Sequence, residues 1–227
     1  MGRTGSFHGG GRVVLRRFVP HGAGRALALS TSCMAEFAPA ELLSLFQRAQ
    51  ASFTDRVDAV GPGQWDDGAL PGWTVADLVA HLVSESLWAP PLLAGEPFDL
   101  IDGRFPDETS DLLGDDPLTG WESAADGALA AFAQDRALLH TVHLQRGPTS
   151  AAEYLEELTA DLTVHSWDLA SATDGDTELD PALVTAALVV ADRLPADGVR
   201  GLFDPPLDVP RTAPPQVRLL GRYGRRS

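Results

Sequence analysis

The sequence predicts an all-α protein built as a bundle of four helices, and three observations carry this prediction. Apolar residues recur at three- and four-residue intervals in several long segments, which is the spacing of one face of a helix. Clusters of Gly and Pro separate these segments from one another. The chain has 227 residues, of which 44% are hydrophobic and 22% charged, and this composition suits one soluble globular domain with a substantial core.

The first helix is expected over Pro39–Val60. Its apolar residues share one helical face, and a Gly-Pro-Gly sequence at positions 61–63 ends it. The second helix opens at Thr74, which forms a variant of the capping box with Asp77. It is expected to stop at Pro90, because a proline lacks the amide hydrogen that a helix interior needs.

Residues 92–117 are rich in Gly, Pro and Asp, so we expect a long acidic crossover that partly covers the mouth of the bundle. A third helix is expected to begin near Pro117 and to cover Trp121–Leu139. Its close-packing side would consist of Ala124, Ala128, Ala131 and Phe132.

The fourth helix has the clearest signal. Ser150 and Glu153 form the S-x-x-E capping box, and one stripe then carries Tyr154, Leu158, Asp161, His165 and Leu169. A further helix is expected over Asp180–Leu194. The Pro-rich end, residues 201–227, is expected to be an extended tail packed on the bundle.

Residues 1–33 differ from the rest of the chain, because they hold five Arg and no Asp or Glu. We expect either a disordered leader or upstream sequence translated from a misplaced start, with Met34 as the true start. The Arg16-Arg17 pair does not indicate an export signal, since Pro20, His21 and Arg25 interrupt the apolar stretch that such a signal needs. The expected domain is therefore a helix bundle over residues 34–200.

Charge and cysteine content limit the partners. The formal net charge of −15 argues against nucleic acid or an anionic membrane surface. No segment approaches the roughly 20 apolar residues of a membrane span. The single cysteine, Cys33, excludes an intramolecular disulfide and a Cys-rich zinc site, which favours a reducing cytoplasm. The partner is therefore expected to be a small molecule or another protein. The chain itself is expected to be a monomer or a homodimer.

A metal site is predicted from His81, Asp161 and His165. The last two residues stand four apart in one helix, so their side chains project one above the other and can reach a single ion. Charged groups on a buried stripe need partners, and a divalent cation would supply one. With His81 from the second helix, three protein ligands would leave one position free for water or substrate.

Other polar residues leave alternatives open. Asp168 either orients His165 by accepting a hydrogen bond or forms a cap or salt bridge with a neighbouring helix. His140 and His143 are interpreted as a chance pair on a solvated loop and not as ligands.

Two motifs resemble those of DinB-like proteins of the mycothiol-dependent maleylpyruvate isomerase type, a family of actinobacteria. Residues 72–82 (GWTVADLVAHL) resemble the motif of the second helix, and residues 164–170 (VHSWDLA) that of the last. Residues 214–222 are similar to the ending of a short metal-binding branch. The resemblance implies a DinB-like four-helix bundle whose divalent metal, commonly zinc, is held by His81, Asp161 and His165. The isomerase type has Glu where this chain has Asp161, so either the ion lies nearer the helix or Glu157 replaces Asp161.

The resemblance also implies a class of activity, a thiol-dependent transferase or isomerase. The metal would take the sulfur of a low-molecular-weight thiol such as mycothiol, and the thiolate would attack an electrophilic substrate. Two other classes use the same site: a non-catalytic metal-binding or stress-related protein, and a metal-dependent hydrolase.

Overall fold

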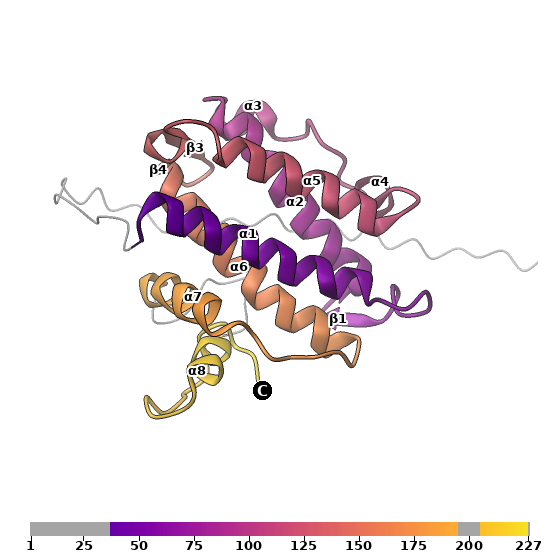
Figure 1. Cartoon of the computed structure of the whole chain (residues 1–227). Coiled ribbons are helices and arrows are strands. Elements are labelled where there is room, and N and C mark those ends of the chain that lie inside the picture. Colours follow the sequence, from indigo (N-terminus) through magenta and orange to yellow (C-terminus); the bar gives the residue numbers. More distant parts are fainter. Residues whose placement is uncertain (1–36, 195–204, 227) are drawn as a thin grey trace, which may run out of the picture.

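The structure is a computed structural model that describes residues 37–194 and 205–226, and most of these residues are helical. Four long helices form the bundle, with α1 packed on α6 and α2 packed on α5 (Figure 1). Their bounds are Pro39–Asp58 for α1, Val75–Leu93 for α2, Pro117–Phe132 for α5 and Ala151–Ala172 for α6. The prediction of an all-α helix bundle is confirmed. The predicted leader, residues 1–33, lies outside the described residues.

The predicted cap of α2 is present. The Thr74 hydroxyl accepts a hydrogen bond from the Asp77 amide at 3.1 Å, and the Asp77 carboxylate accepts one from the Thr74 amide at 3.0 Å. The predicted stop at Pro90 was wrong, because the helix continues to Leu93. A proline loses its own amide bond, but its carbonyl still accepts, and the Ala94 amide donates to the Pro90 oxygen at 3.0 Å. The last turn therefore closes beyond the prolines.

The crossover between α2 and α5 contains two short helices, α3 (Phe98–Ile101) and α4 (Thr109–Leu113). Both helices bury apolar side chains in the core. The prediction of an acidic crossover, which was based on the Gly, Pro and Asp content, did not include these helices. The Thr109 hydroxyl donates to the Asp77 carboxylate at 2.6 Å and so attaches α4 to the first turn of α2.

Helix α5 ends at Phe132 and not at Leu139. Arg136 has a left-handed backbone conformation with φ of 60°, and a short 3₁₀ turn, Ala137–Leu139, follows it. Two antiparallel strands, β3 (Thr141–Leu144) and β4 (Gly147–Ser150), then lead into α6. A second small pair, β1 (Gly68–Leu70) and β2 (Trp73–Thr74), precedes α2.

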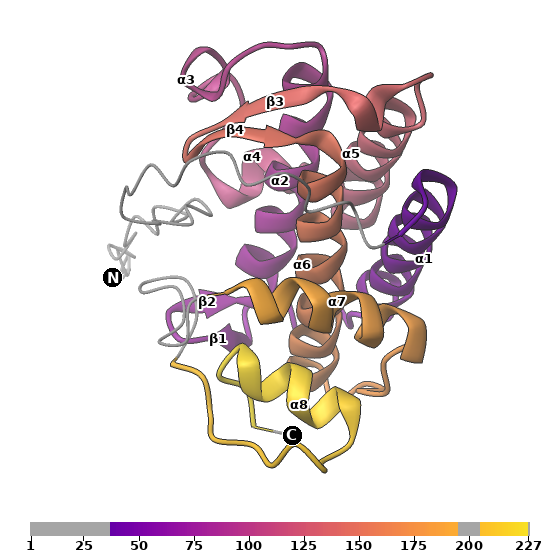
Figure 2. The same cartoon turned by 90° about the vertical axis from the view of Figure 1, so that its left-hand side faces the viewer.

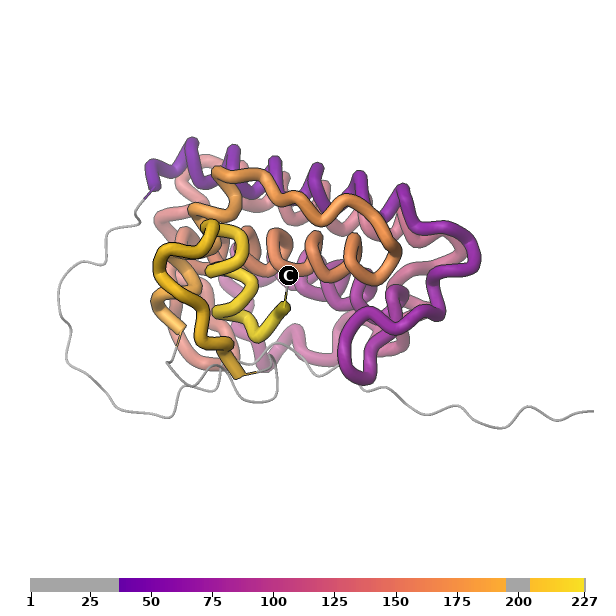
Figure 3. The backbone as a smooth tube through the Cα atoms, turned by 90° about the horizontal axis from the view of Figure 1, so that it is seen from below, coloured from indigo at the N-terminus to yellow at the C-terminus, as the bar shows by residue number. Residues whose placement is uncertain are grey.

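Two further helices, α7 (Pro181–Arg193) and α8 (Pro215–Arg222), lie on the side of α6 that faces away from α2 and α5 (Figures 2 and 3). They share a second apolar cluster with α6, in which Ala160 and Val164 contact Val184, Leu219 and other buried residues. The expectation of an extended tail was wrong for residues 215–222. Pro214 and Pro215 start a helix at the positions where proline is tolerated, so the Pro-rich composition was misleading.

None of the described helices combines the length and the apolar character needed to cross a bilayer.

Candidate metal centre

The three predicted ligands lie together inside the bundle. His81 comes from the middle of α2, and Asp161 and His165 come from successive turns of α6. One ligand atom from each residue lies within 4.8 Å of the other two, and all three residues are buried. The packing of α2 on α6 therefore brings together residues that are 80 positions apart in the sequence.

The Asp161 carboxylate lies between the two imidazole rings. One of its oxygens is 3.3 Å from Nε2 of His81, and the other is 3.4 Å from Nε2 of His165. The two rings meet edge to face with centroids 5.4 Å apart, and Trp73 packs against the His81 ring in the same manner. Two imidazole nitrogens and one carboxylate that converge in this way are a donor set that suits a divalent ion such as zinc.

The opposite charges of the cluster stabilise one another and so offset the cost of burying them. Burial by itself would raise the pKa of Asp161, but the charge of His165 and hydrogen bonds from both histidines hold that pKa well below its usual range. Burial would likewise lower the pKa of His165, yet Asp161 and Asp168 raise it to about 9. Without a metal, protonated imidazole therefore supplies the positive charge that the buried carboxylate needs. A divalent cation would supply the same charge.

Asp168 contacts His165, which was one of the two alternatives that the sequence left open, and it also forms a salt bridge. Its Oδ2 accepts a hydrogen bond from Nδ1 of His165 at 2.9 Å, which directs Nε2 of that ring toward Asp161. Arg225 donates to the same carboxylate, from Nε at 3.0 Å and from Nη2 at 2.8 Å. The cation comes from the segment after α8 and not from a neighbouring bundle helix. Sequence reasoning missed Arg225, because no spacing rule connects it with a residue 57 positions earlier.

Glu157, the alternative carboxylate ligand, lies outside the cluster. Both of its oxygens accept hydrogen bonds at 2.7 Å from Nη2 of Arg146, in the turn between β3 and β4. His140 and His143 are exposed, as expected for residues that do not belong to the cluster. The geometry thus favours Asp161 over Glu157 as the third donor.

A pocket opens beside the cluster, and Asp161 is one of its lining residues. Helix α2 contributes Glu85 and Trp88 to its wall, and α6 contributes Tyr154 and Glu157. A molecule in this pocket would therefore lie beside Asp161, one of the three candidate metal ligands.

Comparison with known proteins identifies the family. The model of the mycothiol maleylpyruvate isomerase N-terminal domain matches residues 68–170, a range that includes all three candidate ligands. Two uncharacterized proteins of Mycobacterium tuberculosis, from two strains, are each 30% identical to the chain in an alignment of 192 residues. The match covers 81% of this chain and 97% of each relative. No solved structure matches the chain. With its helix bundle and its buried His and Asp cluster, the chain belongs to the family of the mycothiol maleylpyruvate isomerase N-terminal domain.

Proposed function

We propose that the chain binds a divalent metal, zinc in the first place, through His81, Asp161 and His165, and acts as a thiol-dependent transferase or isomerase. The observation that carries the proposal is the convergence of three buried donor atoms from two helices within 4.8 Å of one another. The family supplies the second support, since its description names mycothiol as the thiol.

Each residue has a distinct part in this proposal. His81 and His165 would offer Nε2, and Asp161 would offer a carboxylate oxygen from between them. Asp168 holds the proton on Nδ1 of His165, so that the lone pair of Nε2 stays available to a ligand. A bound divalent ion with one position left open would lower the pKa of a coordinated thiol, so that thiolate exists at neutral pH.

The thiol is proposed to come from outside the chain. The sequence contains one cysteine, Cys33, and this residue lies outside the described ranges. The described residues thus hold no cysteine, and the nucleophile in this proposal is a small-molecule thiol such as mycothiol. The pocket beside Asp161 would hold the electrophilic substrate close to the sulfur.

Cobalt substitution tests the thiol role directly. Protein loaded with Co²⁺ in place of zinc should develop a sulfur-to-cobalt charge-transfer band when mycothiol is added, because the sulfur occupies the open position. The oxygen analogue of mycothiol, in which a hydroxyl replaces the thiol, should produce no such band and serves as the control.

Two results would contradict the proposal. A Co²⁺ protein whose spectrum does not respond to mycothiol, and which turns over no electrophile, would favour a non-catalytic metal-binding protein. Hydrolysis of an ester without any thiol would favour the metal-dependent hydrolase, which would use water at the same position.

A further inference from the structure

The pocket beside the candidate metal centre has its own chemical character. It lies between α2 and α6, and Phe98 and residues 144–146 complete its wall. Most of its wall is apolar, and Trp88 and Phe98 meet there edge to face with centroids 5.3 Å apart. A largely apolar wall that carries a few polar groups is typical of sites for small molecules.

Two polar groups in this wall have no partner among the described residues. They are Oε1 of Glu85 and the hydroxyl of Tyr154, and both residues are buried. A buried polar group left without a hydrogen bond costs about 1–3 kcal/mol. Two such groups in one pocket indicate a position where a bound molecule supplies the missing hydrogen bonds.

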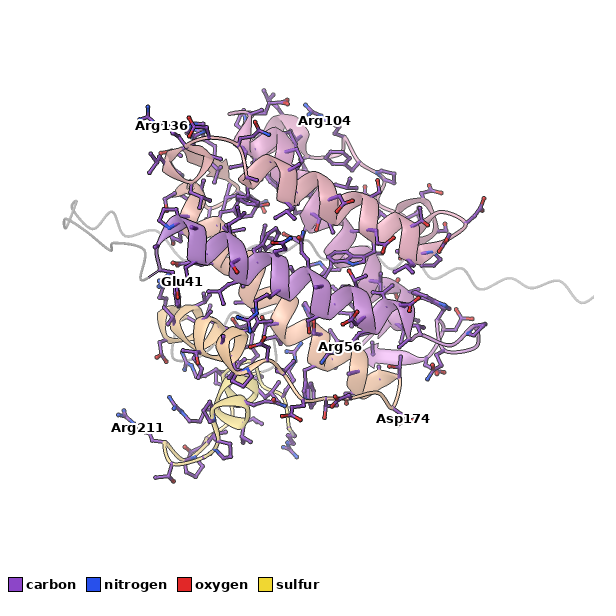
Figure 4. The ribbon with its side chains drawn as sticks, in the orientation of Figure 1. Glu41, Arg56, Arg104, Arg136, Asp174 and Arg211 are labelled. Atoms are coloured by element: carbon purple, nitrogen blue, oxygen red, sulfur yellow. The ribbon has the colours of Figure 1, made fainter. Side chains whose placement is uncertain are left out.

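The charge state of the pocket wall limits which class of molecule can bind there. Burial, and then the negative charges of Asp161 and Glu157, raise the pKa of Glu85 well above its ordinary value, so the surroundings favour the neutral form of this carboxyl. A neutral carboxyl can both donate and accept a hydrogen bond. The cation in the wall, Arg146, already contacts both oxygens of Glu157. By contrast, five of the charged residues labelled in Figure 4 are exposed: Glu41, Arg104, Arg136, Asp174 and Arg211.

We infer that this pocket binds an uncharged molecule with an apolar body and a hydroxyl or amide group, which pairs with Glu85 and Tyr154. The inference deepens the proposed function and rests on it in one respect, because it assigns the electrophilic substrate to this class. A carboxylate would lose its hydration in a desolvated space whose cation, Arg146, is already paired with Glu157. An ammonium ion would need an ionised Glu85, and burial opposes that ionisation.

Three small probes of one shape test the inference on the unaltered full-length protein. Benzyl alcohol, benzylamine and benzoate are titrated by calorimetry, once with a chelator and once with zinc, because benzoate can also bind a metal. We expect benzyl alcohol to bind about 10-fold more tightly than either charged probe in the presence of the chelator. Tighter binding of benzylamine, equal binding of benzoate, or no binding of benzyl alcohol would each overturn the inference.

Variants assign the binding to the two residues. Glu85→Leu and Tyr154→Phe should each weaken benzyl alcohol binding by about 10-fold, the value of one hydrogen bond. Glu85→Gln keeps a neutral group that donates and accepts, so its affinity should stay within about 3-fold of the original. Glu156→Gln is the matched control, because Glu156 is a buried acid of α6 that lies outside the pocket wall. Its Oε1 has no partner among the described residues, and its Oε2 accepts a hydrogen bond from Arg193. Unchanged affinity in both Glu85→Leu and Tyr154→Phe would refute the assignment.

Zinc content, measured on the same samples, separates this inference from the proposed function. Protein that binds zinc but not benzyl alcohol contradicts the pocket assignment alone. Protein that binds benzyl alcohol but not zinc contradicts the metal centre alone.

Discussion

Asp161 differs from two neighbouring acids of α6, Glu157 and Asp168, in what surrounds its carboxylate. Glu157 is paired with Arg146, and Asp168 is paired with Arg225 and His165. Asp161 has two imidazole nitrogens as neighbours, at 3.3 and 3.4 Å. An arginine cannot give up its charge, whereas a histidine can release its proton and bind a metal. This difference makes Asp161 the acid that can share a cation with its neighbours.

We therefore predict that Asp161→Ala weakens zinc binding severely, and that His81→Ala and His165→Ala abolish it, because each removes one of three ligands. Asp161→Glu should retain the metal, since the longer side chain still offers an oxygen. Glu157→Ala is the matched control and should change the affinity by no more than about 10-fold. Elemental analysis and zinc titration of the metal-free proteins measure these effects, and native affinity in Asp161→Ala would exclude Asp161 as a ligand.

Among the helices, the close packing of α5 against α4 depends on a glycine. At Gly120, an added Cβ would meet the backbone oxygen of Leu113 at 2.7 Å, so α4 and α5 could not keep their present distance. At Gly127, in the same helix, an added Cβ would meet nothing within 4 Å. Both glycines therefore lie within the same helix, but only Gly120 has another element packed against its Cα.

This difference predicts opposite effects for one substitution. Gly120→Ala should lower the free energy of unfolding by about 1–3 kcal/mol, because a backbone oxygen cannot move aside as a side chain can. Gly127→Ala should raise it by up to about 1 kcal/mol, the helix preference of alanine over glycine. Denaturant unfolding of both variants measures the two values, and a shift of the same sign in both would contradict the packing argument.

At the scale of the whole molecule, the end of the chain supports the candidate metal centre. Arg225 follows α8 and contacts Asp168, which in turn contacts His165. Arg222 fastens the same helix to α7 by donating to the Ala191 oxygen at 2.6 Å. The orientation of a candidate ligand thus depends on a segment that packs outside the four-helix bundle.

Arg225→Gln should accordingly weaken zinc binding by about 10–100-fold, as loss of a partner behind a metal ligand commonly does. Arg218→Gln serves as the control. It also removes one positive charge near the end of the chain, in α8, but Arg218 is not a hydrogen-bond partner of Asp168. A purely structural role for Arg225 would lower the melting temperature but leave the zinc affinity of the folded protein unchanged. Comparing melting curves with zinc competition titrations decides between the two roles.

The sequence by itself determined the features that depend on contacts within one helix. The caps at Thr74 and Ser150 and the common face of Asp161 and His165 follow from spacings of three and four residues, which local geometry dictates. Helix ends were less predictable. Whether a helix passes Pro90, or begins at Pro215, depends on what the next turn packs against.

Only the tertiary structure decided which distant residues meet. His81 reaches Asp161 because α2 packs on α6. Arg225 reaches Asp168 because α8 packs on α7 and shares an apolar cluster with α6. Glu85 and Tyr154 share a pocket wall for the same reason. No periodicity in a sequence encodes these contacts, because they arise from the burial of apolar faces that belong to separate helices.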